Sequence, residues 1–125
     1  MILDTNALSA LADGDESLSA ALEGVTTLHL PVIVLGEYRF GIRTSRYRRT
    51  YEKWVKQALG DITLLPVLEE TTNHYAGLCA ELKKAGTPIP SNDVWIAAFC
   101  REHALPLISR DRHFDVVKGL RRISW

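Results

Sequence analysis

The chain has 125 residues, 46% of them hydrophobic, which is enough to build one domain with its own core and without disulfide support. Lys and Arg number 15 and so do Asp and Glu, and a net charge of zero, taken alone, argues against a nucleic-acid partner. The longest strictly apolar run, Val94 to Cys100, is far shorter than a membrane span. The two cysteines lie in apolar helical patterns, which is typical of free thiols in a reducing compartment. We therefore expect one soluble, cytoplasmic domain over residues 1–125, with no membrane association.

The charges are distributed unevenly along the chain. Between Tyr38 and Lys56 there are seven basic residues and one acid, so this segment is at +6 and the rest of the chain at −6. Such a segment can bind a phosphate backbone although the whole protein is neutral. The alternative is an ordinary solvated helix face. The residues that we predict to contact such a backbone are Arg39, Arg43, Arg46, Arg48 and Arg49.

The chain begins with an apolar segment that runs directly into an acid. Met1-Ile2-Leu3 is followed by Asp4 and then by Thr5 and Asn6, short polar residues that can start a helix. This pattern predicts a short buried strand that ends in a carboxylate. In open α/β sheets, ligands bind outside the carboxyl ends of the parallel strands. Asp4 is therefore the first candidate for a functional residue.

Periodicity and helix-breaking residues predict the other elements in chain order. In the first half these are a helix with Leu8 and Leu11 that ends at Asp13-Gly14-Asp15, a short helix from Leu18 to Gly24, a strand over Thr27–Leu30, a helix with Pro31 in its first position that continues over Val32–Arg43, and an amphipathic helix from Tyr47 to Leu59. In the second half they are a strand over Ile62–Val67, a helix over Glu69–Ala85 stopped by Gly86, a buried helix that Ser91 or Asn92 caps and whose body is Val94–Cys100, a strand over Leu105–Ser109, a turn or short helix over Phe114–Val117, and a strand over Arg121–Trp125. The alternation predicts an α/β fold, with a central, mostly parallel sheet of about five short strands flanked by helices.

Glu37 is an anomaly in the helix that follows Pro31. Ile33 and Val34 precede it by one turn and Phe40 follows it by one turn, which places a carboxylate on the apolar face. A buried charge needs a cation, an arginine or a proton. The alternative is a carboxylate at the edge of the apolar stripe that reaches solvent.

Two further acids are expected at the same edge of the sheet as Asp4. Asp111 follows the strand over Leu105–Ser109, so in a parallel sheet it lies beside Asp4. Asp93 begins the helix that leads into that strand, and because helix and strand run antiparallel, the helix starts at this edge. Interaction with the helix dipole is the alternative explanation for Asp93 and is worth roughly 0.3–1 kcal/mol.

Clustered carboxylates repel one another and need divalent cations. The sequence offers oxygen ligands and no paired Cys or His at ligand spacing, which favours Mg²⁺ or Mn²⁺ over Zn²⁺. A hard cation held by carboxylates in an open cleft is suited to phosphodiester hydrolysis, because it activates water and neutralises charge on phosphate.

The pattern resembles the PIN-domain ribonucleases, and most closely the VapC-type toxins of toxin–antitoxin pairs. The matching residues span nearly the whole chain and are Asp4-Thr5-Asn6, Glu37 in Val34-Leu35-Gly36-Glu37, Asn92-Asp93 followed by Ile96-Ala97-Ala98, and Ser109-Arg110-Asp111 followed by Phe114. The resemblance implies endonucleolytic cleavage of RNA with Mg²⁺ or Mn²⁺, a homodimer, and a VapB-type antitoxin that blocks the site.

The resemblance also implies a role for individual residues. The metal-binding and catalytic acids are Asp4, Glu37, Asp93 and Asp111, and Asp115 is a possible accessory ligand. Thr5, Asn6 and Ser109 support the site, with Ser109 in place of the more usual threonine. His113 lies two residues after Asp111, but we interpret it as an ordinary exposed histidine and assign it no role.

Three other functions remain open at this point. An aspartate-nucleophile phosphatase also begins with an acid after its first strand, but that chemistry wants a second acid where this chain has Asn6. A non-enzymatic PIN-like scaffold could bind RNA or a partner, although clustered acids are of little use beside a phosphate ligand. A PIN nuclease of RNA processing, rather than a toxin, is the third. The RNA target, the number of ions and the antitoxin do not follow from the sequence.

Overall fold

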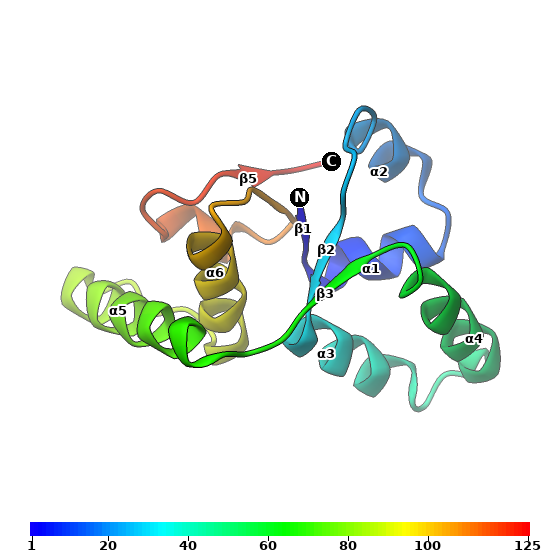
Figure 1. Ribbon diagram of the computed structural model, residues 1–125, viewed down its shortest axis with the longest axis horizontal. Helices are drawn as coiled ribbons and strands as arrows, with labels where there is room; N and C mark the ends of the chain where they lie inside the picture. Colours follow the sequence, from blue (N-terminus) through cyan, green and yellow to red (C-terminus); the bar gives the residue numbers. More distant parts are fainter.

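The computed structural model describes residues 1–125 as strands and helices in alternation (Figure 1). The strands are β1 (Ile2–Leu3), β2 (His29–Pro31), β3 (Thr63–Leu65), β4 (Leu107–Ile108) and β5 (Arg122–Ile123). The helices are α1 (Thr5–Ala12), α2 (Glu16–Ala21), α3 (Val32–Ile42), α4 (Arg48–Ala58), α5 (Glu69–Ala85), α6 (Ser91–His103) and the 3₁₀ helix η1 (Arg112–Val116). The predicted α/β alternation is confirmed.

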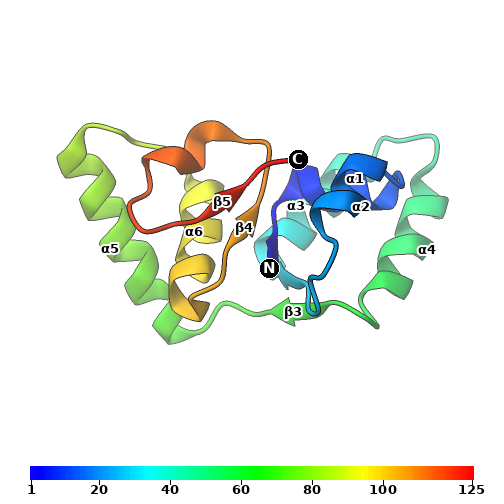
Figure 2. The same ribbon diagram turned by 90° about the horizontal axis from the view of Figure 1, so that it is seen from above.

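The five strands form one sheet in the order β3-β2-β1-β4-β5, and every pairing in it is parallel. β1 is central, and its residues Ile2 and Leu3 are fully buried because the sheet is covered on both faces. Figure 2 shows α5 and α6 grouped on one side and α1 to α4 on the other, with β1, β4 and β5 between the two groups. All strands therefore end at the same edge of the sheet, which is where the acids that follow β1 and β4 were predicted to lie.

Two predicted helix starts were wrong. Pro31 is the last residue of β2 and the N-cap of α3, so it precedes the helix instead of filling its first position. Pro90 precedes α6 in the same way, and Ser91 is the first helical residue instead of its cap. In both cases proline has a backbone ψ near 140°, which is extended and ends the preceding segment immediately before the helix.

Two aromatic residues lie outside the core that their spacing predicted. Phe40 was expected on the apolar face of its helix, but it is 83% exposed. Tyr47 is also exposed and precedes α4 instead of continuing its apolar stripe. The remaining apolar residues of α4 pack as expected, with Val55 buried and Trp54 against Tyr38 of α3. No helix has the length and apolar character needed to cross a lipid bilayer.

Helix α5 allows a direct test of backbone conformation in this fold. Gly86 follows the helix in the left-handed region, at φ +69°, whereas Gly77 lies within the helix with open space around its missing side chain. Gly86→Ala should lower the free energy of unfolding by about 1–2 kcal/mol, because an L-residue is strained in that region. Gly77→Ala should raise it by up to about 1 kcal/mol, because alanine favours the helix. Urea unfolding of both variants measures the two effects, and a loss of stability in Gly77→Ala would contradict the assignment of that residue to a helix interior.

Candidate metal-binding active site

Asp4 ends β1 and begins α1. Its side chain is nearly buried, with the residue 4% exposed, and it caps α1 by accepting a hydrogen bond from the Thr5 amide at 2.7 Å. Its second carboxylate oxygen accepts hydrogen bonds from the Ser109 hydroxyl at 2.5 Å and from the Asn6 side-chain amide at 2.8 Å. Burial raises the pKa of Asp4, the hydrogen bonds from Ser109 and Thr5 lower it, and the charges of neighbouring acids raise it again. Hydrogen bonds thus fix the position of the Asp4 carboxylate, while burial and the neighbouring acids disfavour its ionised form.

Glu37 is half-buried on α3, and its carboxylate contacts two other helices. One oxygen accepts a hydrogen bond from the Thr5 hydroxyl of α1 at 2.5 Å, and the other accepts one from the Asn92 side-chain amide of α6 at 2.7 Å. Neutral donors therefore satisfy this carboxylate, and no arginine is needed. Asn92 belongs to the Asn92-Asp93 pair of the family pattern, but its contact with Glu37 was not predicted. The sequence feature that could have indicated this contact is a side-chain amide directly before an acid at a helix start.

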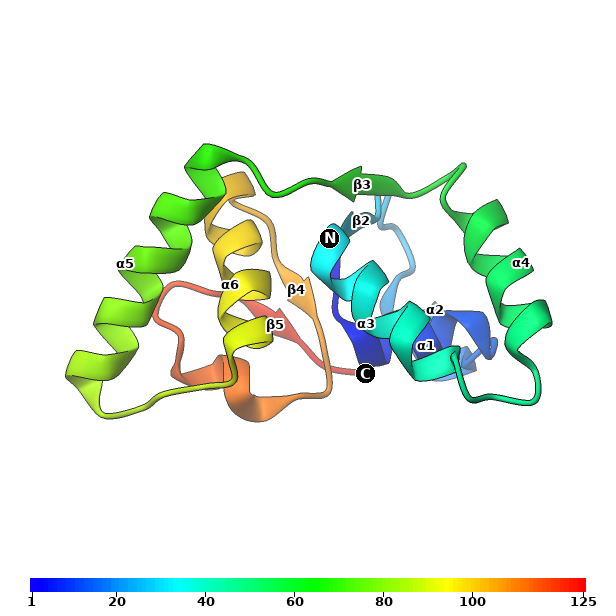
Figure 3. The ribbon, with the colours of Figure 1, turned by 90° about the horizontal axis from the view of Figure 1, so that it is seen from below.

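Asp93 and Asp111 form a second group with His113. Asp93 lies in the first turn of α6, and Asp111 caps η1 by accepting a hydrogen bond from the His113 amide at 2.8 Å. Figure 3 shows the orange η1 segment beside the start of α6. The Nδ1 atom of His113 lies 3.1 Å from Asp93 Oδ2 and 3.3 Å from Asp111 Oδ1. His113 is exposed, as expected, yet it contacts both acids, which its position in the sequence did not indicate.

The charge of Asp93 is also disfavoured by its surroundings. Burial raises the pKa of Asp93, the hydrogen bond with His113 lowers it, and the charges of Asp111 and Asp4 raise it. Its side chain is 15% exposed, whereas that of Asp111 is 35% exposed. Repulsion among acids from β1, α6 and the end of β4 is therefore part of the electrostatics of this site.

Two polar side chains connect these acids across the ends of β1 and β4. The buried Ser109 hydroxyl donates to Asp4 and accepts a hydrogen bond from the Asp111 amide at 2.9 Å. Asn6 donates to Asp4 with its amide nitrogen and accepts a hydrogen bond from the Arg110 amide at 3.2 Å with its carbonyl oxygen. The structure thus brings Thr5, Asn6 and Ser109 into direct contact with the acids.

These donor groups fit a hard divalent cation. Asp93, Asp111 and His113 each offer a ligand atom, and these atoms all lie within 4.8 Å of one another. Carboxylate oxygens predominate, which suits Mg²⁺ or Mn²⁺, and neither cysteine takes part in the cluster. A neighbouring hollow of about 290 Å³, lined by residues of α1, α3 and α4, includes Thr5 and Glu37.

Asp115 lies apart from these acids. Its carboxylate forms a bidentate pair with the Arg122 guanidinium, at 2.6 and 3.0 Å. This pair lowers the pKa of Asp115, so the carboxylate is already neutralised by a cation of the protein. The geometry gives no support to an accessory metal role for Asp115.

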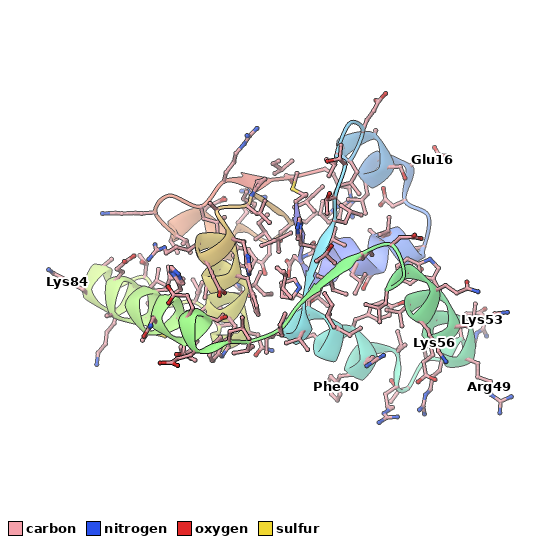
Figure 4. The ribbon with its side chains drawn as sticks, in the orientation of Figure 1. Glu16, Phe40, Arg49, Lys53, Lys56 and Lys84 are labelled. Atoms are coloured by element: carbon pink, nitrogen blue, oxygen red, sulfur yellow. The ribbon has the colours of Figure 1, made fainter.

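The basic residues lie on α3, on α4 and between them. Arg39 and Arg43 are exposed, Arg46 stacks on the Tyr47 ring at 4.8 Å, and Arg48 pairs with Glu52 at 2.8 Å. Figure 4 shows Arg49, Lys53 and Lys56 projecting from α4, and Phe40 projecting from α3. Within this basic segment, α3 is the helix that also carries an acid of the site, Glu37.

Comparison with known proteins identifies the family. The PIN domain family profile matches residues 1–120. The chain belongs to the PIN domain family. Ribonuclease VapC5 of Mycobacterium tuberculosis is 32% identical to this PIN domain over 94% of the chain and 87% of the relative. Ribonuclease VapC2 of Haemophilus influenzae is 30% identical over 88% of the chain and 84% of the relative.

Solved structures share the fold of this PIN domain. A VapBC2 complex of Rickettsia felis bound to a promoter DNA fragment contains a chain that matches with a TM-score of 0.90 and 23% identity, covering 99% of this chain and 97% of that one. VapBC-5 of Mycobacterium tuberculosis matches with a TM-score of 0.75 and 27% identity, covering 98% and 94%. The five-stranded parallel architecture is thus that of known PIN proteins.

Repulsion among the acids predicts opposite effects of one substitution with and without metal. Asp93→Asn removes one charge at nearly constant volume, so in EDTA the variant should melt at or above the wild type, although it loses about 0.3–1 kcal/mol of helix-dipole stabilisation. Saturating Mn²⁺ should shrink or reverse that difference. A single ion at ~100 times its dissociation constant adds about 2.7 kcal/mol to the protein that binds it. Thermal melts of both proteins measure this, and equal stabilisation by Mn²⁺ would show that Asp93 does not bind the ion.

The same pair of proteins has a predicted pH dependence. A raised pKa means that folded wild type keeps a proton on Asp93 that the unfolded chain has released, so the charge costs stability only above the unfolded pKa near 3.8. In EDTA, the advantage of Asp93→Asn should therefore be largest near pH 7 and shrink as the pH falls toward 4. Taking the difference between the two proteins cancels the titration of groups that do not interact with Asp93, including His29, whose pKa burial lowers.

Proposed function

We propose that this PIN domain is a metal-dependent endoribonuclease that hydrolyses RNA phosphodiester bonds, and that it acts as the toxin of a VapBC-type toxin–antitoxin pair. The observation that carries the proposal is the meeting of Asp4, Glu37, Asp93 and Asp111 at one sheet edge, in contact with Thr5, Asn6, Asn92 and Ser109. The relatives named ribonuclease VapC give the substrate class. Mg²⁺ and Mn²⁺ are the proposed ions.

The acids have separate tasks in this proposal. When bound, a divalent ion polarises the phosphate and activates water. Asp93 and Asp111 are more exposed than Asp4 and would hold the ion where substrate can reach it. Asp4 is buried and fixed by three donors, so it sets the position of the negative charge beneath the site. Glu37 is oriented toward α1 and α6 by Thr5 and Asn92, which removes the entropy cost of ordering it during the reaction.

The substrate would be held by the basic face beside these acids. Arg39 lies on α3 and Arg43 caps its end, both within two turns of Glu37. The hydrogen bond from Arg48 lowers the pKa of Glu52 on α4, and the charges of Arg43 and Arg39 lower it further. Phe40 offers an exposed ring between them, and bases of single-stranded RNA stack on such rings. The arrangement supports binding of single-stranded RNA across α3.

The proposed partners follow from the relatives. Several matched structures are complexes described as VapBC, two of them bound to DNA. We infer a VapB-type antitoxin that covers the site of this chain, a homodimer, and a cytoplasmic location. A neighbouring small gene that encodes a DNA-binding protein would separate this function from that of a PIN nuclease in RNA processing.

The other two functions have less support. A phosphatase nucleophile must approach phosphorus freely, whereas both oxygens of Asp4 are engaged and buried. A scaffold that only binds RNA would gain nothing from neighbouring acids whose pKa values are raised, such as Asp4 and Asp93. The geometry therefore favours a metal-dependent nuclease over a phosphatase and over a binding scaffold.

Individual substitution of the acids tests the proposed reaction. Asp4→Asn, Glu37→Gln, Asp93→Asn and Asp111→Asn should each lower cleavage of an RNA oligonucleotide in Mg²⁺ or Mn²⁺ by at least about a hundredfold, as expected for loss of an ion or its orientation. Excess EDTA should abolish wild-type cleavage. Asp115→Asn is the matched control and should retain activity. Full activity of Asp93→Asn, or undiminished cleavage in EDTA, would refute the proposal.

Salt dependence tests the proposed RNA-binding residues. In an Asp93→Asn background, which keeps the RNA intact, the double substitution of Arg39 and Arg43 by Ala should weaken binding to all single-stranded sequences. The slope of log affinity against log salt should flatten by about 0.7 per lost phosphate contact. A triple substitution of Arg46, Arg48 and Arg49 tests the α4 side in the same way.

The control for this experiment lies at the far end of the molecule. Lys83 and Lys84 end α5, away from α3 and α4, so their replacement by Ala removes the same charge without touching the proposed surface. If the arginine variants and this control have equal slopes, the basic segment is only a solvated face. Normal RNA binding with loss of antitoxin binding would assign the segment to the antitoxin.

A further inference from the structure

His113 contacts two acids of the site, but the proposed function gives it no role. It lies in the first turn of η1, and its amide is held by Asp111 at 2.8 Å, which turns the imidazole back toward that residue. Nδ1 then lies 3.1 Å from Asp93 and 3.3 Å from Asp111. The backbone of its own helix therefore directs the ring at Asp93 and Asp111.

The spacing of these atoms matches a shared ion. Adjacent ligands of a six-coordinate ion with bonds of about 2.1 Å are about 3 Å apart, and opposite ligands are about 4.2 Å apart. Nδ1 meets the first spacing with both carboxylates, and no two of the three ligand atoms are more than 4.8 Å apart. Asp4 is not part of this compact set, and its oxygens accept hydrogen bonds from Thr5, Asn6 and Ser109.

We propose that His113 Nδ1 is a direct ligand of the catalytic ion, so that Asp93, Asp111 and His113 form a mixed oxygen and nitrogen site. This inference rests on the proposed function and adds a nitrogen ligand to its carboxylates. His113 is 55% exposed, so an ion bound there would keep open positions for water and phosphate.

A nitrogen ligand changes which ions the site prefers. Mg²⁺ takes oxygen ligands and keeps its waters, so an imidazole adds little to its binding. Transition-metal ions accept imidazole nitrogen, with affinity rising from Mn²⁺ through Co²⁺. The proposed ligand set therefore selects Mn²⁺ over Mg²⁺, and His113 is the residue that determines this selectivity.

A hydrogen bond is the competing explanation of the same distances. In that case Nδ1 carries a proton that it donates to Asp93, and the imidazole only orients the acid. His113→Asn separates the two, because the side-chain amide of Asn can donate near the Nδ1 position and provides an oxygen but no imidazole nitrogen. A hydrogen-bonding role survives this change, whereas a nitrogen ligand does not.

The experiment measures metal binding to the intact protein without RNA. Calorimetric titration should show that His113→Asn and His113→Ala bind Mn²⁺ about tenfold more weakly than wild type, with Mg²⁺ affinity changed by less than about twofold in the Asn variant. Pulsed electron paramagnetic resonance of the Mn²⁺ protein should show coupling to a ¹⁴N nucleus in wild type and none in either variant. His74→Gln is the control, since His74 also contacts a carboxylate, Glu70 at 3.2 Å, outside the site.

The outcomes distinguish this inference from the proposed function. Absence of ¹⁴N coupling in the wild type, its persistence in His113→Ala, or equal Mn²⁺ affinity in wild type and His113→Asn would overturn the nitrogen ligand. Cleavage of RNA by His113→Asn in Mg²⁺, together with loss of cleavage in Asp93→Asn, would leave the nuclease proposal intact. An inactive wild type with the expected ¹⁴N coupling would keep the ligand and remove the nuclease.

Discussion

The hydrogen bond between the Ser109 hydroxyl and the buried Asp4 carboxylate is the interaction on which the rest of the site depends. β1 and β4 pair over only two residues each, Ile2 with Leu107 and Leu3 with Ile108. The Asp4 amide continues this pairing by donating to Ile108 at 3.3 Å, and the Ser109 hydroxyl then joins the side chains beyond the last backbone pair. Because Ser109 also accepts from the Asp111 amide, one hydroxyl fixes two acids. The sheet thus transmits its register directly into the positions of the carboxylates.

Much of this arrangement follows from local sequence. Asp4 has to end a buried strand and begin a helix, and those two requirements alone place it at the carboxyl edge of the sheet. Gly86 ends α5 because it adopts a conformation that other residues disfavour. Asp111 follows a second buried strand for the same reason as Asp4. Each of these positions is set by the residue and its immediate neighbours.

Other contacts join side chains that are distant in sequence, and periodicity carries no information about them. The hydrogen bonds that Glu37 accepts from Thr5 and Asn92 depend on how three helices approach one another. The donors that satisfy Glu37 were therefore not predictable. Phe40 is a residue for which periodicity predicted a contact that the structure does not contain. Helical spacing gives its direction relative to other residues of α3, but whether another element covers that direction is decided by the path of the chain, which leaves it exposed.

Helix α3 gives the proposed function a simple physical basis for inhibition. It carries Glu37 toward α1 and α6, and Arg39, Phe40 and Arg43 toward solvent, all within three turns. Glu37 and the two arginines therefore lie on different sides of the same helix. In the proposed function, Arg39 and Arg43 supply cations for RNA on the same helix that carries Glu37. A protein segment that occupies the same face would exclude RNA by position and charge, without any change in the acids themselves.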